Sequence, residues 1–146
     1  ARIKETMQEV SAALDEYEFK KASDSVMSLA DYGNIYFQNH EPWKLVKSDK
    51  AAAASVLYSC LQIAKALIIF MEPVMPSKMH NAWKQMGLEG DVADRLFSEA
   101  LTPLNVGQAL GRPEILFSRL EDTSVKELEG MVKSVLGPVI DDIFKK

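Results

Sequence analysis

Apolar residues recur at helical spacing along nearly the whole chain, and this periodicity constrains the fold more than any other feature. One helix is marked near the start by Ile3, Met7, Val10 and Leu14. A second apolar stripe follows on one helix face, formed by Phe19, Ala22, Val26, Leu29, Ala30, Gly33 and Phe37. No segment shows the alternation that is typical of a β-strand. The sequence therefore predicts an all-α bundle of about five or six helices.

Polar residues and prolines predict where the early helices begin and end. Asp15 with Glu18 forms a capping-box pattern, which predicts the start of the second helix. Pro42 predicts the end of that helix, because the residue before a proline avoids helical geometry. Residues 39–41 are therefore expected to form a turn.

The middle of the chain predicts two further helices. A long helix begins at Ser48 or Asp49, either of which can cap it, and is stopped by Pro73. The next helix begins at Pro76 and ends in a left-handed cap at Gly87. Its inward face is expected to carry Ala82, Trp83 and Met86.

The last third of the chain carries weaker helical signals. A short helix is predicted over residues 92–100, and residues 101–121 are expected to form a long irregular segment that packs on the bundle. Ser124 with Glu127 predicts the start of a final amphipathic helix. The apolar face of that helix consists of Val125, Leu128, Val132 and Val135.

The length of 146 residues fits one domain. Gly137-Pro138 is expected to break the final helix. We therefore divide the chain into a helical bundle over residues 1–136 and a C-terminal extension or linker over residues 137–146. Charges throughout residues 1–10 make a signal peptide unexpected there.

Composition limits the cellular setting and the class of partner. The single cysteine, Cys60, cannot form an internal disulfide, which favours a reducing, cytoplasmic location. The most apolar stretch, Val56–Met71, contains Gln62 and Lys65 and is short for a bilayer span, so we expect a buried core helix and no membrane. The net charge of −4 argues against broad wrapping by nucleic acid but permits a local contact.

The residue patterns of common active sites are absent from the sequence. His40 and His80 lie far apart, without metal-ligand partners at useful spacing, and His40 is interpreted as a solvated loop residue. No glycine-rich phosphate loop and no nucleophile motif occurs. We therefore predict no catalytic residue, no metal and no cofactor in this chain, which is not expected to be an enzyme by itself.

Pro42-Trp43 is the segment most suggestive of function. A tryptophan at a helix-terminating turn, held by the preceding proline, offers a flat face on which a nucleobase can stack. Lys44, Lys47 and Lys50 follow closely and can meet backbone phosphates. From the residues alone, a second interpretation stays open, in which Trp43 plugs one end of the bundle and the lysines form a solvated helix start.

Three segments resemble the C-terminal helical domain of the methionyl-tRNA synthetase family. The first is the pattern formed by Ala30, Gly33, Asn34, Tyr36, Pro42, Trp43 and Lys44. The others are Glu72-Pro73-x-Met75-Pro76 and Gly111-x-Pro113-x-x-Leu116-Phe117-x-Arg119-Leu120. The resemblance covers residues 3–136. The sequence from Gly33 to Leu45 is closer to that of archaeal and eukaryotic members than to that of bacterial ones.

The resemblance implies a role for each residue of the first segment. In the family the proline–tryptophan pair contacts anticodon bases, so Trp43 becomes the expected stacking platform and Pro42 the residue that fixes its direction. Asn34 and Tyr36 are expected to support the shape of this anticodon-binding site. Phosphate contacts are expected from Lys44, Lys47 and Lys50.

The sequence also departs from the family pattern. The family domain begins one helix earlier, with an asparagine and an arginine that read the anticodon, and no equivalent of these residues is found here. The catalytic domain, which uses ATP, has no counterpart in this sequence either. The expected partners are therefore the anticodon loop of methionine tRNA and a synthetase catalytic domain. The alternative is a protein-interaction module of the same ancestry without RNA binding, which the acidic balance favours.

Overall fold

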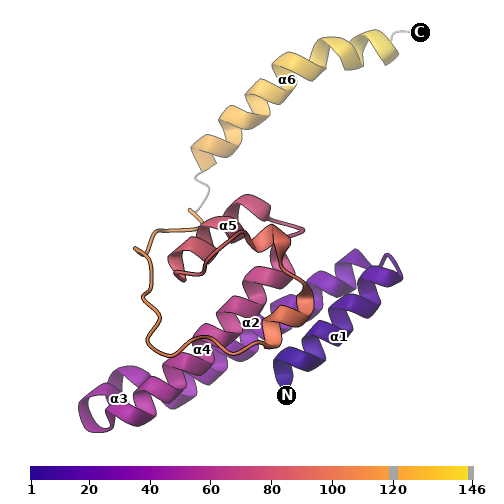
Figure 1. Cartoon of the computed structure of the whole chain (residues 1–146). Helices are drawn as coiled ribbons and strands as arrows, with labels where there is room; N and C mark the ends of the chain where they lie inside the picture. Colours follow the sequence, from indigo (N-terminus) through magenta and orange to yellow (C-terminus); the bar gives the residue numbers. More distant parts are fainter. Residues whose placement is uncertain (119–121, 145–146) are drawn as a thin grey trace. The chain divides into compact units, whose positions relative to one another are not determined.

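The computed structural model describes residues 1–118 and 122–144, and the chain forms two compact units, Ala1–Glu114 and Ile115–Lys146. The described residues contain six α-helices and two 3-10 helices, and none of these residues is in a strand. The predicted all-α fold is therefore confirmed. Figure 1 shows packed helices crossed by an irregular segment in the first unit and one long helix in the second.

Helices α1 (Arg2–Asp15) and α2 (Phe19–His40) form a hairpin in the first unit. Their facing side chains are buried, with Val10 of α1 and Leu29 of α2 almost inaccessible to solvent. This burial is what the apolar stripes predicted. The turn between the helices contains Tyr17 at a φ of 59°, a left-handed conformation that costs a non-glycine residue about 1–2 kcal/mol.

The predicted start of α2 is wrong in two respects. Asp15 is the last residue of α1, and Glu18 is the N-cap of α2 but makes no side-chain cap bond. The Glu18 carboxylate instead pairs with the Lys21 ammonium at 2.6 Å. Phe19 is 66% exposed although the spacing placed it on the buried stripe, because α1, its packing partner, has already ended at Asp15.

Helix α4 (Lys50–Met71) is the core helix of the first unit. Asp49 caps it as predicted, because its Oδ1 accepts a hydrogen bond from the Ala52 amide at 3.0 Å. Helix α4 is long and apolar enough to cross a membrane, but buried core helices meet the same criteria of length and composition. Its packing against α1, α2 and α5 (Pro76–Gln85) supports the core interpretation. The side chains it buries are Ala53, Val56, Ile63, Lys65, Ala66, Ile68, Ile69 and Phe70.

Helix α5 ends in the predicted left-handed cap. Gly87 has a φ of 66°, its amide donates to the Lys84 carbonyl at 2.9 Å, and the Leu88 amide donates to the Trp83 carbonyl at 3.3 Å. This pair of bonds is a Schellman motif. A side chain on Gly87 would collide with the carbonyl oxygen of Ala109, so the irregular segment packs directly on the cap. Trp83 is 3% exposed and is a core residue, as predicted.

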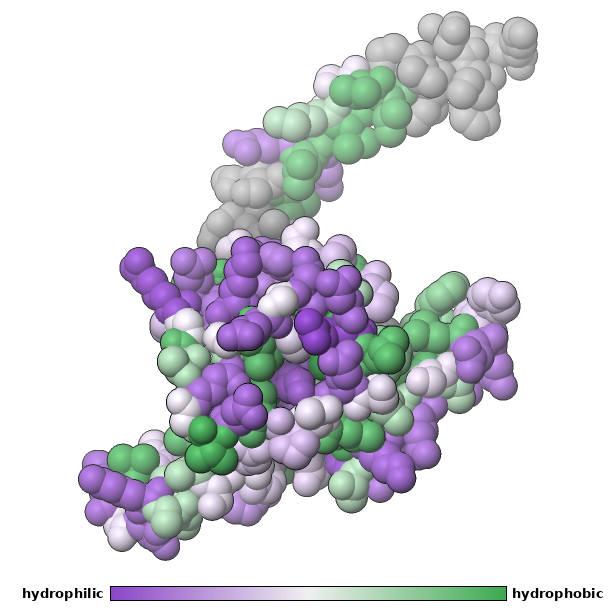
Figure 2. Space-filling model, viewed as in Figure 1, coloured by the Kyte–Doolittle hydropathy of each residue, from purple (hydrophilic) through white to green (hydrophobic). Residues whose placement is uncertain are grey.

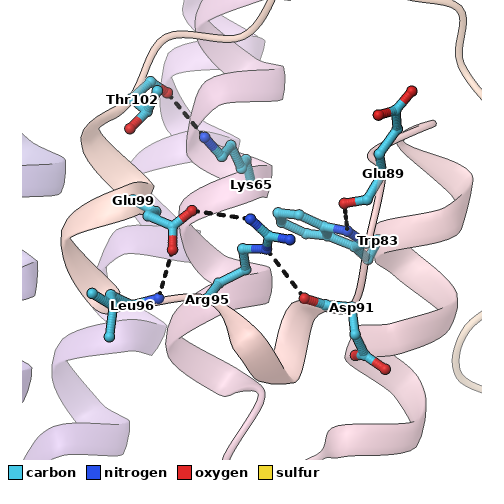
Figure 3. Close-up of polar contacts among 8 residues, drawn as sticks. All are labelled: Lys65, Trp83, Glu89, Asp91, Arg95, Leu96, Glu99 and Thr102. Carbon is cyan, nitrogen blue, oxygen red and sulfur yellow. Dashed lines mark hydrogen bonds and ion pairs between the residues drawn. The ribbon is translucent and has the colours of Figure 1, made fainter.

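The predicted helix over residues 92–100 is instead two 3-10 helices, η1 (Val92–Asp94) and η2 (Phe97–Leu101). Arg95 and Leu96 are extended between them. Figure 3 shows how side chains hold this break: the Glu99 carboxylate accepts from the Leu96 amide at 2.9 Å and lies 3.3 Å from the Arg95 guanidinium. These local side-chain bonds compete with a continuous α-helix.

Polar side chains of α4 position the backbone that follows η2. The Gln62 amide nitrogen donates to the Ala100 and Thr102 carbonyls at 3.0 Å, and its oxygen accepts from the Leu104 amide at 3.1 Å. The Lys65 ammonium donates to the same Thr102 carbonyl at 3.0 Å (Figure 3), and burial lowers the pKa of Lys65. Gln62 and Lys65 thus supply the partners that irregular backbone lacks.

The irregular segment was predicted over residues 101–121, of which 119–121 lie outside the described residues. Residues 102–118 carry no helix, as expected. The Gly111 amide donates to the Gln85 carbonyl at 2.8 Å, and the Gln108 side chain donates to the Met86 carbonyl at 2.6 Å. The segment is therefore attached to the end of α5.

The second unit consists mainly of α6 (Asp122–Phe144), which begins two residues before the predicted cap at Ser124. The predicted break at Gly137-Pro138 is wrong, because α6 continues through it to Phe144. A proline removes only one backbone donor, and the turns on either side can maintain the helix. The division of the chain into residues 1–136 and 137–146 stays a prediction.

The apolar face predicted for α6 is present, and within the second unit its side chains are exposed. Figure 2 shows hydrophobic residues gathered along this helix. The exposed set comprises Val125, Leu128, Met131, Val132, Val135 and Leu136.

Candidate nucleic-acid interface

The junction between α2 and α3 (Pro42–Ser48) places the candidate residues at one end of the α2–α4 pair (Figure 1). The predicted turn over residues 39–41 is wrong in extent, because α2 continues to His40 and only Glu41 links the two helices. Glu41 adopts the left-handed region, with φ 43° and ψ 55°. Pro42 then occupies the first turn of α3, where its missing N–H leaves no bond unmade.

Trp43 is neither a sealed plug nor a fully exposed ring. The residue is 45% exposed, and its ring centroid lies 5.4 Å from that of Phe37 on α2, at an interplanar angle of 52°. Pro42 beside it is buried. The indole is therefore supported from behind by the bundle while much of its surface faces solvent, which is the geometry that a stacking platform requires.

The three candidate lysines lie close to Trp43 in the chain and are exposed. Lys44 pairs with Glu41 at 2.6 Å across one turn of α3. Lys47 lies in the last turn of α3, and Lys50 is the first residue of α4. Lys44 is the one member of this group with an ion pair in the described part of the chain, so Lys47 and Lys50 can meet an incoming phosphate without first breaking one.

Asn34 and Tyr36 lie upstream on α2 and differ from each other in environment. Asn34 is exposed, and Tyr36 is half-buried. The Tyr36 ring contacts His40, with centroids 4.1 Å apart, and Tyr32, with centroids 6.4 Å apart. Among the described residues, the Tyr36 ring contacts the rings of His40 and Tyr32 but not that of Trp43. The structure thus packs Trp43 on Phe37, with the lysines nearby in the chain, and it places Tyr36 in a separate aromatic row.

Two residues of this surface were not recognised as part of it from the sequence. Phe37 was assigned only to the apolar stripe, and it is the ring on which Trp43 packs. His40 was interpreted as a solvated loop residue, and it is the exposed last residue of α2, in contact with Tyr36. Its four-residue spacing from Tyr36 was the available signal, because side chains at that spacing meet on a helix.

Comparison with known proteins gives a single consistent family. The family model described as "Anticodon binding domain of methionyl tRNA ligase" matches residues 1–134. Similar proteins named methionine–tRNA ligase include that of Methanothrix thermoacetophila, which is 59% identical over 128 residues, covering 88% of this chain and 19% of the relative. The relative from Methanosarcina acetivorans is 52% identical over 129 residues, covering 88% of this chain and 18% of the relative.

A third relative, from Archaeoglobus fulgidus, is 46% identical over 132 residues, covering 90% of this chain and 20% of the relative. The chain thus spans about a fifth of the length of the curated relatives it matches. These archaeal relatives agree with the lineage suggested by the segment from Gly33 to Leu45. Because the family model covers nearly the whole chain, this chain belongs to the family of anticodon-binding domains of methionyl-tRNA ligases.

Proposed function

We propose that this domain binds the anticodon loop of methionine tRNA at the α2–α3 junction. An unpaired loop base stacks on the exposed surface of Trp43, while buried Pro42 fixes the direction of the indole. The single observation that carries the proposal is the half-exposed Trp43 ring resting on Phe37. Stacking of a base on an aromatic side chain contributes about 1–3 kcal/mol.

The lysines supply the electrostatic part of the proposed contact. With a net charge of −4, the chain as a whole does not attract a polyanion, so attraction has to be local. Lys47 and Lys50 are exposed and lie close to Trp43 in the chain, and Lys44 can exchange Glu41 for a phosphate. Asn34 and Tyr36 support the shape of the site from α2.

We further propose that the full-length protein is a cytoplasmic methionine–tRNA ligase. Its catalytic domain, outside this chain, joins methionine to the tRNA and uses ATP. The relatives carry that name, and this chain corresponds to about a fifth of their length. In this scheme the present chain contributes recognition, and no cofactor binds to it.

A titration with a hairpin RNA that carries the methionine anticodon tests the proposal. Amide NMR shifts are followed in this chain, and a hairpin with a scrambled loop serves as the control. We expect shifts centred on residues 34–50 with the methionine anticodon and much weaker shifts with the scrambled loop. Equal responses to both hairpins, or shifts centred on α5, would contradict the proposal.

The apolar face of α6, which is exposed within the second unit, favours a second candidate, a protein-interaction module without RNA binding. That face includes Leu128, Val132 and Val135, and contiguous exposed apolar surface marks interaction sites. The same titration separates the two candidates. No response at millimolar RNA concentration favours the interaction module.

A further inference from the structure

The end of α2 carries a second pair of rings beside the Phe37–Trp43 pair. The ring centroids of Tyr36 and His40 are 4.1 Å apart, with an interplanar angle of 34°. Tyr32 extends the row, because its ring is stacked with that of Tyr36 at 6.4 Å and 26°. His40 is exposed at the tip of this row, and Tyr36 is half-buried behind it.

The imidazole of His40 is held in a fixed orientation. Its Nδ1 lies 2.8 Å from the Tyr36 carbonyl oxygen, which can only accept, so Nδ1 donates this hydrogen bond. The other ring nitrogen, Nε2, is left for an external partner. A ring that is anchored by both a hydrogen bond and an aromatic neighbour loses little freedom when something stacks on it.

The two ring pairs lie on adjacent faces of the same helix end. At about 100° per residue, His40 and Phe37 are separated by about 60° around the axis of α2. Trp43 follows His40 after only Glu41 and Pro42, so both outer rings belong to the same end of the bundle. Lys47 lies in the last turn of α3, and Lys50 is the first residue of α4.

We propose that the Tyr36–His40 pair is a second stacking platform, which takes another unpaired base of the RNA loop that binds at Trp43. This inference rests on the proposed function and adds a second recognition point to it. Phe37 already packs against the indole of Trp43, so the indole has room for only one stacked base. A second unpaired base of the loop needs another surface on which to stack. The aromatic row that ends in His40 is such a surface at the same end of α2.

The test compares variants of the whole chain that change one ring at a time. His40→Gln removes the ring but keeps hydrogen-bonding capacity, whereas His40→Tyr keeps a ring. Trp43→Ala removes the first platform. Phe19→Ala is the matched control, because it removes an exposed aromatic side chain at the opposite end of the same helix. Circular dichroism establishes that each variant is folded.

Binding is measured with hairpins that carry a fluorescent purine analogue at one loop position at a time. We expect His40→Gln to weaken binding by about fivefold or more. It should also release the analogue at a loop position different from the one released by Trp43→Ala. His40→Tyr should bind within about twofold of the unmodified protein, and Phe19→Ala should bind as the unmodified protein does.

Three results would overturn the second platform while Trp43→Ala still weakens binding. They are unchanged binding by His40→Gln, equal losses in His40→Gln and His40→Tyr, and release of the same loop position by both platform variants. Unchanged binding by Trp43→Ala has a different meaning, because it contradicts the proposed function itself. The failure of either idea is therefore recognisable.

Discussion

Replacing Trp43 with alanine separates the structural role of this side chain from its proposed role in binding. The residue is 45% exposed. About half of the roughly 200 Å² that a buried indole hides is therefore hidden here, or about 100 Å². At about 25 cal/mol per Å² this corresponds to about 2.5 kcal/mol, and the compactness of the unfolded chain lowers it to about 2 kcal/mol.

We therefore expect Trp43→Ala to lower the free energy of unfolding by about 2 kcal/mol, less than the roughly 3–5 kcal/mol lost when a core tryptophan is removed. Urea unfolding followed by circular dichroism measures this, since Trp83 is the one tryptophan that the variant retains. Binding of the anticodon hairpin should weaken in the same variant by about 5- to 150-fold, which corresponds to a stacking contribution of about 1–3 kcal/mol.

Either extreme would refute the reasoning. A stability loss above about 4 kcal/mol means that the indole is buried in solution, and a buried ring cannot act as a platform. A loss below about 0.5 kcal/mol means that Phe37 does not support it, contrary to the 5.4 Å ring contact. Phe19→Ala, at the other end of α2, gives the baseline for removing an exposed ring.

Three further predictions concern charge and backbone geometry. Glu41→Gln removes the ion-pair partner of Lys44 and one negative charge. RNA affinity should therefore rise by a few-fold in low salt and by less in high salt. A decrease in affinity in a filter-binding assay would contradict this. Burial lowers the pKa of Lys65 from its ordinary value of 10.5, so the unfolded chain binds more protons between the two pKa values. The free energy of unfolding of the unmodified protein should therefore rise with pH through that window, up to about 10.5, relative to that of Lys65→Met. If urea unfolding gives parallel stability–pH curves for the two proteins, this prediction is refuted. Gly87→Ala should lower the free energy of unfolding by about 2 kcal/mol or more, because it adds left-handed strain and a collision with Ala109; an unchanged melting temperature would exclude this packing.

The long helices were predictable because their signals are local. The cap at Asp49, the stop near Pro73 and the left-handed Gly87 each act within one helical turn, and the structure confirms them. The failures came from residues whose local signal had two meanings. Pro42 ends one helix but is also a favoured first residue of the next, so α3 was missed. Asp15 and Glu18 have capping-box spacing, yet Asp15 belongs to α1.

The candidate site was predictable in residue type but not in arrangement. The sequence predicted Trp43 and the lysines as site residues, because an aromatic ring followed by basic residues is the chemistry of nucleic-acid contact. It did not show that Phe37 supports the indole or that Tyr36 packs on His40. The Phe37–Trp43 contact depends on how α2 turns into α3, and that turn depends on the left-handed conformation of one glutamate, Glu41. The Tyr36–His40 contact lies within α2, and its four-residue spacing was the signal that went unused.

Glu41 links the strain in this turn to the stiffness of the proposed site. A left-handed conformation costs a non-glycine residue about 1–3 kcal/mol, and it persists only where the surroundings enforce it. Here the buried Pro42, in the first turn of α3, holds the turn from its far side. Because only Glu41 links α2 to α3, His40 and Trp43 are held at the ends of two helices, not on a flexible loop. Rings positioned in this way lose little conformational entropy on binding, so most of each stacking interaction can contribute to affinity.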